Sequence, residues 1–293
     1  MNFSKIPGKI YFNNKFVVSN KANVHVLNHS LHFASSVFEG IGVYDKKPLF
    51  IKEHFKRLFL SAKLMGLKMN CNQRKLEKIT YRIIKQNKLR YGYIRPIVYR
   101  SANSMTPDTK ECRSLFAIAG WEWKKMFGKK NGISLHVSKW PRLNQDIYPI
   151  AAKSSGSYQT SVIAKKTAHK KGFDDCLMLD LKKNIAESSA CNIFWVKRNT
   201  IYTPLTHSIL NGITRQAIIK LCKKLRIKCL IGNYKLSKIL KADAVFLTGT
   251  AAEIQIVSKI NRKKFKINND LINLLKNNYE KVKKKSPDLV SEI

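Results

Sequence analysis

The chain has 293 residues, 44% of them hydrophobic, and is long enough to bury the core of one large domain or of two medium ones. Lys and Arg outnumber Asp and Glu by 56 to 18, but these cations are spread along the whole chain without an aromatic-interleaved basic stripe, so no specific nucleic-acid partner is expected. The apolar runs are short, so we expect no membrane span, and the N-terminus lacks the apolar stretch of a signal peptide, so we expect a cytoplasmic protein. The six cysteines show neither metal-ligand nor disulfide spacing and are expected to be free thiols, with no metal site.

The N-terminal part is predicted to begin with a hairpin over residues 9–19, because two strand-like runs flank an Asn-Asn pair that tolerates the left-handed conformation of a tight turn. The run HVLNHSLHFASSVFEGIGVYD then predicts a turn or short helix that leads into a strand. Along this strand Phe38, Gly40 and Gly42 share one face. A face with two glycines and one aromatic ring suits the floor of a pocket.

Two helices and two strands are expected next. The segment EHFKRLFLSAKLMGL, which contains Arg57, has apolar residues at helical spacing, and a second helix is expected over residues 73–87. The strand YIRPIVYRS places Tyr93 and Arg95 on one side, and Pro96 inside it favours an edge strand or a bulge. The run SLFAIAGWEW predicts another strand.

A charged, glycine-bearing run, KKMFGKKNG, is typical of a mobile connection between domains. We therefore expect a small N-terminal domain over residues 1–123, a connection over 124–132 and a larger C-terminal domain over 133–293 that carries Lys153.

The stretch AAKSSGSY sets Lys153 between small residues, which leave room for a flat cofactor against the backbone. Tyr158 lies at the expected start of a helix, and Glu187 lies in the turn between the strands CLMLD and NIFWV. A lysine, a phenol and a carboxylate are groups that a pyridoxal phosphate site can use. By spacing alone, however, a solvated loop lysine is the commoner outcome. Farther on, a helix expected from Gly212 would offer free backbone N–H groups to an anion.

Six motifs change this balance. In chain order they are SLHFASSVFEGI, YIRP, AAKSSGSY, IAESSACNIF, LNGITR and TGTAAEI. Together they resemble the fold-type IV pyridoxal-phosphate aminotransferases, and the first two resemble the branched-chain amino acid aminotransferases within that group. The resemblance runs from about residue 12 to about residue 257. It implies an α/β (α+β) chain of two domains, a smaller N-terminal α/β domain and a larger β-barrel-like C-terminal domain with helices.

The resemblance also assigns roles to residues. Lys153 would be the catalytic lysine that forms the Schiff base with pyridoxal 5'-phosphate, Arg57 would bind its phosphate, Tyr158 its ring oxygen and Glu187 its pyridine nitrogen. Further cofactor contacts are expected from Leu210, Gly212, Ile213, Thr214 and Thr250. Substrate contacts are expected from Phe33, Phe38, Gly40, Tyr93, Arg95, Trp123, Thr250 and Ala251.

The implied reaction is reversible amino transfer between L-leucine, L-isoleucine or L-valine and 2-oxoglutarate, which yields L-glutamate and branched 2-oxo acids by a ping-pong mechanism. The implied assembly is a homodimer or a trimer of dimers. Two departures affect the expected substrate range: Gly42 stands where the family commonly has arginine, and Phe33 where it often has tyrosine.

Three alternatives remain at this stage. A D-amino acid aminotransferase or an aminodeoxychorismate lyase would share the fold and the lysine. From a different class, a basic nucleic-acid-binding protein on a relic fold would account for the net charge of +38.

Overall fold

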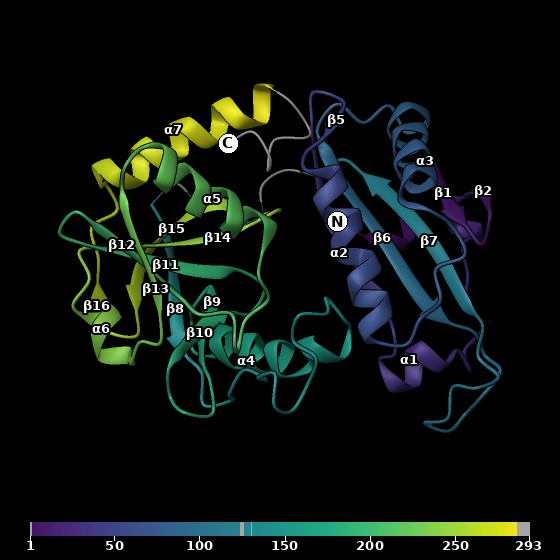
Figure 1. The fold of residues 1–293 in the computed structure, drawn as a ribbon, viewed down its shortest axis with the longest axis horizontal. Helices are drawn as coiled ribbons and strands as arrows, with labels where there is room; N and C mark the ends of the chain where they lie inside the picture. Colours follow the sequence, from purple (N-terminus) through teal and green to yellow (C-terminus); the bar gives the residue numbers. More distant parts are fainter. Residues whose placement is uncertain (1, 124–125, 130, 286–293) are drawn as a thin grey trace. The chain divides into compact units, whose positions relative to one another are not determined.

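The computed structural model describes residues 2–123, 126–129 and 131–285, which divide into two compact units (Figure 1). The first unit contains residues 2–123 and 152–156. The second contains residues 126–151 and 157–285. The short segment with Lys153 therefore packs with the first unit, although the chain on either side of it belongs to the second. Residues 124, 125 and 130 of the expected connection, and 286–293 of the expected C-terminal domain, lie outside the described residues.

The first unit is built on an antiparallel sheet of order β2-β1-β7-β6-β4-β5, in which β3 also pairs with β6. Its strands are β1 (Lys9–Phe12), β2 (Lys15–Val18), β3 (Val37–Phe38), β4 (Ile41–Tyr44), β5 (Lys47–Pro48), β6 (Gly92–Arg100) and β7 (Ser114–Trp121). Its helices are η1 (Phe3–Lys5), η2 (Ser19–Lys21), α1 (His29–Phe33), α2 (Ile51–Leu64) and α3 (Gln73–Gln86).

Several local predictions are confirmed in this unit. β1 and β2 form the predicted hairpin, and Asn13 and Asn14 in its turn have φ angles of 46° and 73°. α2 and α3 are the two predicted helices. On α2 the apolar side chains of Phe55, Leu58 and Ala62 follow one face at helical spacing and are fully buried in the core that α2 and α3 form with the sheet.

Pro96 lies inside the sheet and in a continuous register, so the expectation of an edge strand or bulge is wrong. β6 has β7 on one side and both β3 and β4 on the other. β3 and β4 keep one register along β6, which places Glu39 opposite Pro96. The Glu39 N–H donates to the Pro96 carbonyl at 2.9 Å, but proline has no N–H with which to return the bond. The sheet therefore tolerates Pro96 at the loss of one hydrogen bond, and this position lies between β3 and β4.

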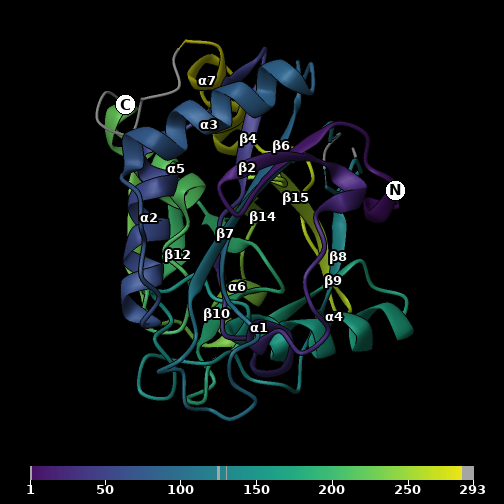
Figure 2. The same cartoon turned by 90° about the vertical axis from the view of Figure 1, so that its right-hand side faces the viewer.

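The second unit contains a closed ring of six strands, which confirms the predicted barrel-like fold. The ring order is β10-β9-β8-β15-β14-β11, and a pairing between β11 and β10 closes it. β8, β9 and β15 run side by side in both views of the molecule (Figures 1 and 2). The strands are β8 (Ile133–Val137), β9 (Asp175–Leu179), β10 (Ile185–Ser188), β11 (Asn192–Lys197), β12 (Thr200–Pro204), β13 (Lys228–Gly232), β14 (Ala244–Gly249), β15 (Glu253–Ile260) and β16 (Lys263–Lys264).

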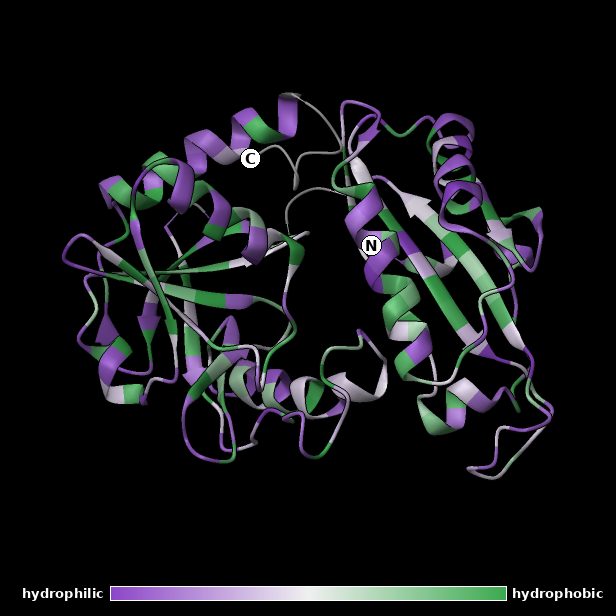
Figure 3. Cartoon of the chain, in the orientation of Figure 1, coloured by the Kyte–Doolittle hydropathy of each residue, from purple (hydrophilic) through white to green (hydrophobic). Residues whose placement is uncertain are grey.

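Alternate residues of the barrel strands fill its interior. Ile193 and Trp195 of β11, Val245 and Leu247 of β14, and Val257 of β15 are all fully buried in one cluster. Figure 3 shows these strands as mainly apolar, whereas α7 is largely hydrophilic. The helices of this unit are η3 (Gly156–Tyr158), α4 (Gln159–Lys170), α5 (Ile213–Lys224), α6 (Leu236–Leu240) and α7 (Asp270–Lys285). No helix in the described part of the chain is long and apolar enough to span a membrane.

Candidate active site

Lys153 is held in the first unit through its backbone. Its N–H donates to the Ser61 hydroxyl of α2 at 2.9 Å, and its carbonyl accepts the N–H of Phe38 at 3.0 Å. The next residue, Ser154, bridges to Val37 of β3. Ser154 is completely buried, which explains why small residues follow the lysine. The Lys153 ammonium nitrogen lies 4.9 Å from the centre of the Phe38 ring.

The structure brings most of the predicted substrate residues together around the same ring. The Arg95 guanidinium carbon lies 4.8 Å from the Phe38 ring centre and 5.3 Å from that of Tyr93. The Tyr93 ring in turn lies 4.9 Å from the Trp123 ring. A Cβ at Gly40 would overlap the Tyr93 hydroxyl, so this position requires glycine. Cations and aromatic rings thus form one continuous group in this unit.

Phe33 lies apart from this group in the contacts described, whereas Gly42 of β4 lies opposite Tyr93 of β6. Phe33 ends α1 with 40% of its surface exposed, and its ring lies 4.6 Å from that of His29. A Cβ at Gly42 would lie 2.8 Å from the Tyr44 ring. Tyr44 therefore occupies space next to the position at which the resemblance expects an arginine. A substrate role for Phe33 stays a prediction.

Arg57 forms a buried ion-pair network that the sequence did not indicate. Its Nε donates to Glu39 Oε1 at 2.6 Å and its Nη2 to Glu39 Oε2 at 3.0 Å. His54, one turn earlier on α2, contacts Glu39 Oε2 through Nδ1 at 2.6 Å. The Gly40 N–H also donates to Glu39 Oε2, at 3.1 Å.

Glu39 is charged and His54 is neutral in this network. Burial raises the pKa of Glu39, but Arg57 and the contact with His54 outweigh it and hold that pKa well below its usual range. Burial lowers the pKa of His54, against the attraction of Glu39, and the charges of Arg57 and Lys153 lower it further. Because a carboxylate can only accept, the neutral imidazole must donate its Nδ1 proton to Glu39.

In the second unit, Glu187 is also held by a buried partner. Arg142 donates from Nε to Glu187 Oε1 at 2.8 Å, and Asn192 donates from Nδ2 to Glu187 Oε2 at 2.9 Å. Arg142 also donates from Nη1 to the Ser157 carbonyl, and its guanidinium carbon lies 5.7 Å from the centre of the Tyr158 ring. Arg142 therefore connects two predicted cofactor residues, Tyr158 and Glu187.

Asn192 extends this network to the start of α5. Its Nδ2 donates to the Leu210 carbonyl at 2.9 Å, and a Cβ at Gly212 would overlap its Oδ1. Gly212 is the residue before α5, and no side chain of the described residues caps that helix end. Ile213 and Thr214 follow in its first turn, where backbone N–H groups lack partners within the helix.

Thr250 and Ala251 lie in the turn between β14 and β15. Glu187 pairs with Asn192, and Asn192 pairs with Thr248 on the next strand, so this turn follows at the same end of the barrel. The Ala251 carbonyl accepts the Met126 N–H at 3.1 Å.

Four residues of these networks were missed from the sequence. Glu39 carried a signal, because it is a lone carboxylate within an apolar run, and His54 shares a helix with Arg57 at a spacing of three. Asn192 stands in the motif IAESSACNIF, five residues after Glu187, and meets it across the pairing of β10 and β11. Arg142 stands in a segment that carries no local signal, and it reaches Glu187 from a position 45 residues away.

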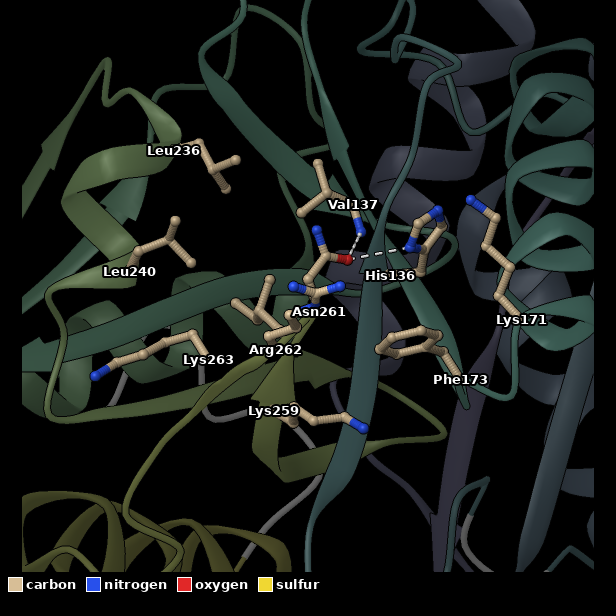
Figure 4. A pocket seen from close by; sticks show the side chains of 11 residues that line it. His136, Val137, Lys171, Phe173, Leu236, Leu240, Lys259, Asn261, Arg262 and Lys263 are labelled. Carbon is tan, nitrogen blue, oxygen red and sulfur yellow. Dashed lines mark hydrogen bonds between the residues drawn. The ribbon is translucent and has the colours of Figure 1, made fainter.

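An open groove in the second unit, about 870 Å³ in volume, lies elsewhere (Figure 4). Its lining includes four cations, Lys171, Lys259, Arg262 and Lys263, but none of the predicted site residues. The predicted site residues therefore do not line this groove, whereas Arg57 and Glu187 belong to the buried charge networks.

Comparisons with known proteins identify the family of the chain. A family model described as amino-transferase class IV matches residues 36–260. The chain is 38% identical over 252 residues to a probable branched-chain-amino-acid aminotransferase of Rickettsia felis, with 86% of each chain covered. It is 36% identical over 260 residues to the branched-chain-amino-acid aminotransferase of Escherichia coli, which covers 86% of this chain and 84% of that one. A solved branched-chain amino acid aminotransferase of T.th., with pyridoxamine 5'-phosphate, has a TM-score of 0.91 and 33% identity over 96% of each chain.

The fold and the matched model define the class: the chain belongs to the class IV aminotransferases, as its six motifs predict. These three relatives are all named as branched-chain enzymes, which confirms the narrower resemblance of the two N-terminal motifs.

Proposed function

We propose that the protein transfers the amino group of L-leucine, L-isoleucine or L-valine to 2-oxoglutarate, reversibly and by a ping-pong mechanism. Its cofactor, as a class IV aminotransferase, is pyridoxal 5'-phosphate. The observation that carries the proposal is the placement of Lys153 and Arg95 against the same Phe38 ring. A reactive amine, an apolar surface and a second cation are the three features that this pair of substrates needs.

The residues present fit the cofactor. The uncapped first turn of α5, after Gly212, has the backbone donors that suit a phosphate. The Arg57 guanidinium adds a planar fork for phosphate oxygens, and Glu187 offers a buried carboxylate for a protonated pyridine nitrogen. We propose that Tyr158, Leu210, Ile213, Thr214 and Thr250 complete the cofactor contacts.

When bound, the cofactor supplies an aldehyde that carries the amino group and a ring that accepts the electron pair of the broken Cα–H bond. Lys153 supplies the base: its Nζ would take the proton from the substrate Cα and would pass it to C4′ of the bound cofactor. The two backbone hydrogen bonds of Lys153 fix the position from which its side chain starts. Glu187 holds the pyridine proton in place.

Arg95 would let one pocket accept both substrates. Its Nε is buried and has no hydrogen-bond partner among the described residues, so a distal carboxylate of 2-oxoglutarate would satisfy it. The Phe38 and Tyr93 rings beside it offer the apolar surface that a branched side chain needs. Gly40 makes room for the Tyr93 hydroxyl beside it, and we propose that Trp123 and Ala251 also contact the substrate.

The assembly and the location stay predictions. We propose a homodimer or a trimer of dimers, which light scattering on the purified protein checks. A cytoplasmic location is likewise expected only from the sequence.

Steady-state kinetics tests the proposal. Initial rates with L-leucine and 2-oxoglutarate varied together should give parallel double-reciprocal lines, and Lys153→Ala should abolish turnover. Arg95→Leu should raise KM for 2-oxoglutarate more than KM for L-leucine, while Arg90→Leu, an exposed control, should change neither. Intersecting lines would exclude the ping-pong order, and turnover of D-alanine but not L-leucine would select the D-amino acid alternative.

A further inference from the structure

We propose that Glu39 is a positioning residue, which holds the Arg57 guanidinium in the orientation that binds the cofactor phosphate. The inference rests on the proposed function, because Arg57 is the phosphate ligand only there. It adds a residue that does not itself touch the cofactor and acts through Arg57.

The geometry of the pair favours orientation over simple charge balance. An arginine side chain is long and flexible, and a single contact would leave its planar group free to rotate. Glu39 instead contacts two nitrogens, Nε and Nη2, so that one edge of the fork is fixed in both distance and plane. A guanidinium carries its N–H donors in a planar fork, and Glu39 engages the edge of this fork formed by Nε and Nη2.

Glu39 is itself held from several sides. Its side chain is fully buried, and Oε2 accepts hydrogen bonds from the His54 imidazole and the Gly40 N–H as well as from Arg57. Its backbone N–H is bonded to Pro96 in the neighbouring strand. Because these contacts fix the Glu39 carboxylate, they also fix the orientation of the Arg57 guanidinium that is bonded to it.

The same network joins the two elements that hold Lys153. α2 supplies His54, Arg57 and Ser61, at spacings of three and four, and Ser61 accepts the Lys153 N–H. Glu39 directly follows β3. In β3, Val37 pairs with Ser154, and the Phe38 N–H donates to the Lys153 carbonyl. If Glu39 had only a structural role, its loss would therefore disturb both the Lys153 segment and the phosphate contact of Arg57. If Glu39 positions Arg57, its loss would weaken the phosphate contact alone.

The two roles separate in a comparison of cofactor forms. We would remove the cofactor from the full-length protein and titrate it, by absorbance, with pyridoxal 5'-phosphate and with pyridoxal, which lacks the phosphate. The variants are E39Q, R57Q and the double variant E39Q/R57Q, with E280Q as a control on an exposed carboxylate. E39Q should weaken binding of pyridoxal 5'-phosphate about tenfold or more and that of pyridoxal by less than about twofold.

The double variant gives the decisive result. If Glu39 acts through Arg57, E39Q/R57Q should bind both ligands as R57Q does, with no added loss. Equal losses for pyridoxal 5'-phosphate and pyridoxal in E39Q, or an unchanged affinity for both, would overturn the proposal. Should E39Q not fold, E39D replaces it, because a shorter carboxylate withdraws from Arg57 and should still lower the affinity ratio.

Failure of the proposed function gives a different pattern. If R57Q loses no phosphate-dependent affinity, Arg57 is not the phosphate ligand and the underlying assignment fails. If R57Q loses it and E39Q does not, only the role of Glu39 is wrong.

Discussion

The two units of the protein each bury one arginine–glutamate pair, but the members of the pairs exchange roles. In the first unit the proposed cofactor ligand is Arg57 and its partner is Glu39; in the second the ligand is Glu187 and its partner is Arg142. The side chain of Glu39 is 0% exposed against 13% for Arg57, and that of Arg142 is 2% exposed against 7% for Glu187. In both pairs the more exposed member is the proposed ligand.

This difference indicates how such a site is built. A charge that must meet a ligand keeps some access, and a fully buried counter-charge is placed behind it. Neither partner can be removed without a large loss of stability, because the charge left behind would be buried without compensation. In the proposed assignment, the more exposed member of each pair is the ligand and the less exposed member is its support.

The largest expected effect comes from removing a ligand carboxylate. Glu187→Gln keeps an oxygen for Arg142 but removes the charge that holds the pyridine proton. We expect kcat to fall roughly 100- to 1000-fold, the range for the loss of one well-placed electrostatic contact. Steady-state assays with L-leucine measure it, with Glu280→Gln as the exposed control. A kcat within about twofold of the parent protein would remove Glu187 from the site.

Removal of Arg142, the cation that pairs with Glu187, should lower the free energy of unfolding. Arg142→Leu removes the cation that pairs with the buried Glu187 carboxylate, so we expect a loss of roughly 3–5 kcal/mol in the free energy of unfolding. Urea unfolding followed by tryptophan fluorescence measures it. Arg90→Leu, which breaks an exposed pair with Asp45, should cost no more than about 1 kcal/mol. An equal loss in the free energy of unfolding for Arg142→Leu and Arg90→Leu would contradict the view that the buried pair supports the structure and the exposed pair does not.

Two glycines allow each unit to be disturbed separately. Gly212→Ala should push Asn192 away from Glu187 and weaken cofactor affinity, since a Cβ there overlaps the Asn192 side chain. We expect a loss of about tenfold, the value of one hydrogen bond to a charged group. Titration with pyridoxal 5'-phosphate measures it. Unchanged affinity would show that Asn192 does not support the cofactor.

Gly40→Ala should act on the substrate instead. The added Cβ overlaps the Tyr93 hydroxyl, so the ring must move and KM for L-leucine should rise severalfold, while cofactor affinity stays near that of the parent protein. The two glycine variants serve as controls for each other. A loss of cofactor affinity in Gly40→Ala would mean that the two functions are not separated as proposed.

The smallest effect is a dependence of stability on pH. Arg57 and His54 together hold the pKa of Glu39 below its ordinary value of 4.5, so the stabilisation is complete above that pH and is lost as the pH falls further. The lowered pKa of His54 acts in the same direction, because its burial also disfavours protonation in the folded protein. Melting temperatures from about pH 6 to about pH 3 should therefore converge for the parent protein and Glu39→Gln. A constant difference would contradict a charged Glu39.

Part of the proposed site is expected from short motifs. Lys153 and Glu187 each stand in one of the six motifs, and Arg57 stands on a helix that the apolar spacing predicts. The supports behind them were not predictable, because Arg142 lies 45 residues from Glu187 and meets it only when the barrel closes. Pairing across that distance leaves no periodic trace in the sequence.

The fold shows the same division. The Asn13–Asn14 turn and the apolar face of α2 follow from local residue types, and both were predicted. Pro96 was misplaced, because the cost of one lost ladder bond is small against the burial of a central strand. The packing of the Lys153 segment with the first unit depends on long-range bonds to Ser61 and Phe38, which local patterns do not encode.

We propose that this chain moves an amino group through a cofactor held by Lys153. The most direct test is the absorption spectrum of the purified protein, recorded before and after L-leucine and again after 2-oxoglutarate. We predict a cofactor band in the near-ultraviolet or visible range that L-leucine removes and 2-oxoglutarate restores, and that Lys153→Ala no longer cycles. A protein that stays colourless with added pyridoxal 5'-phosphate, or a band that L-leucine leaves unchanged, would contradict the account.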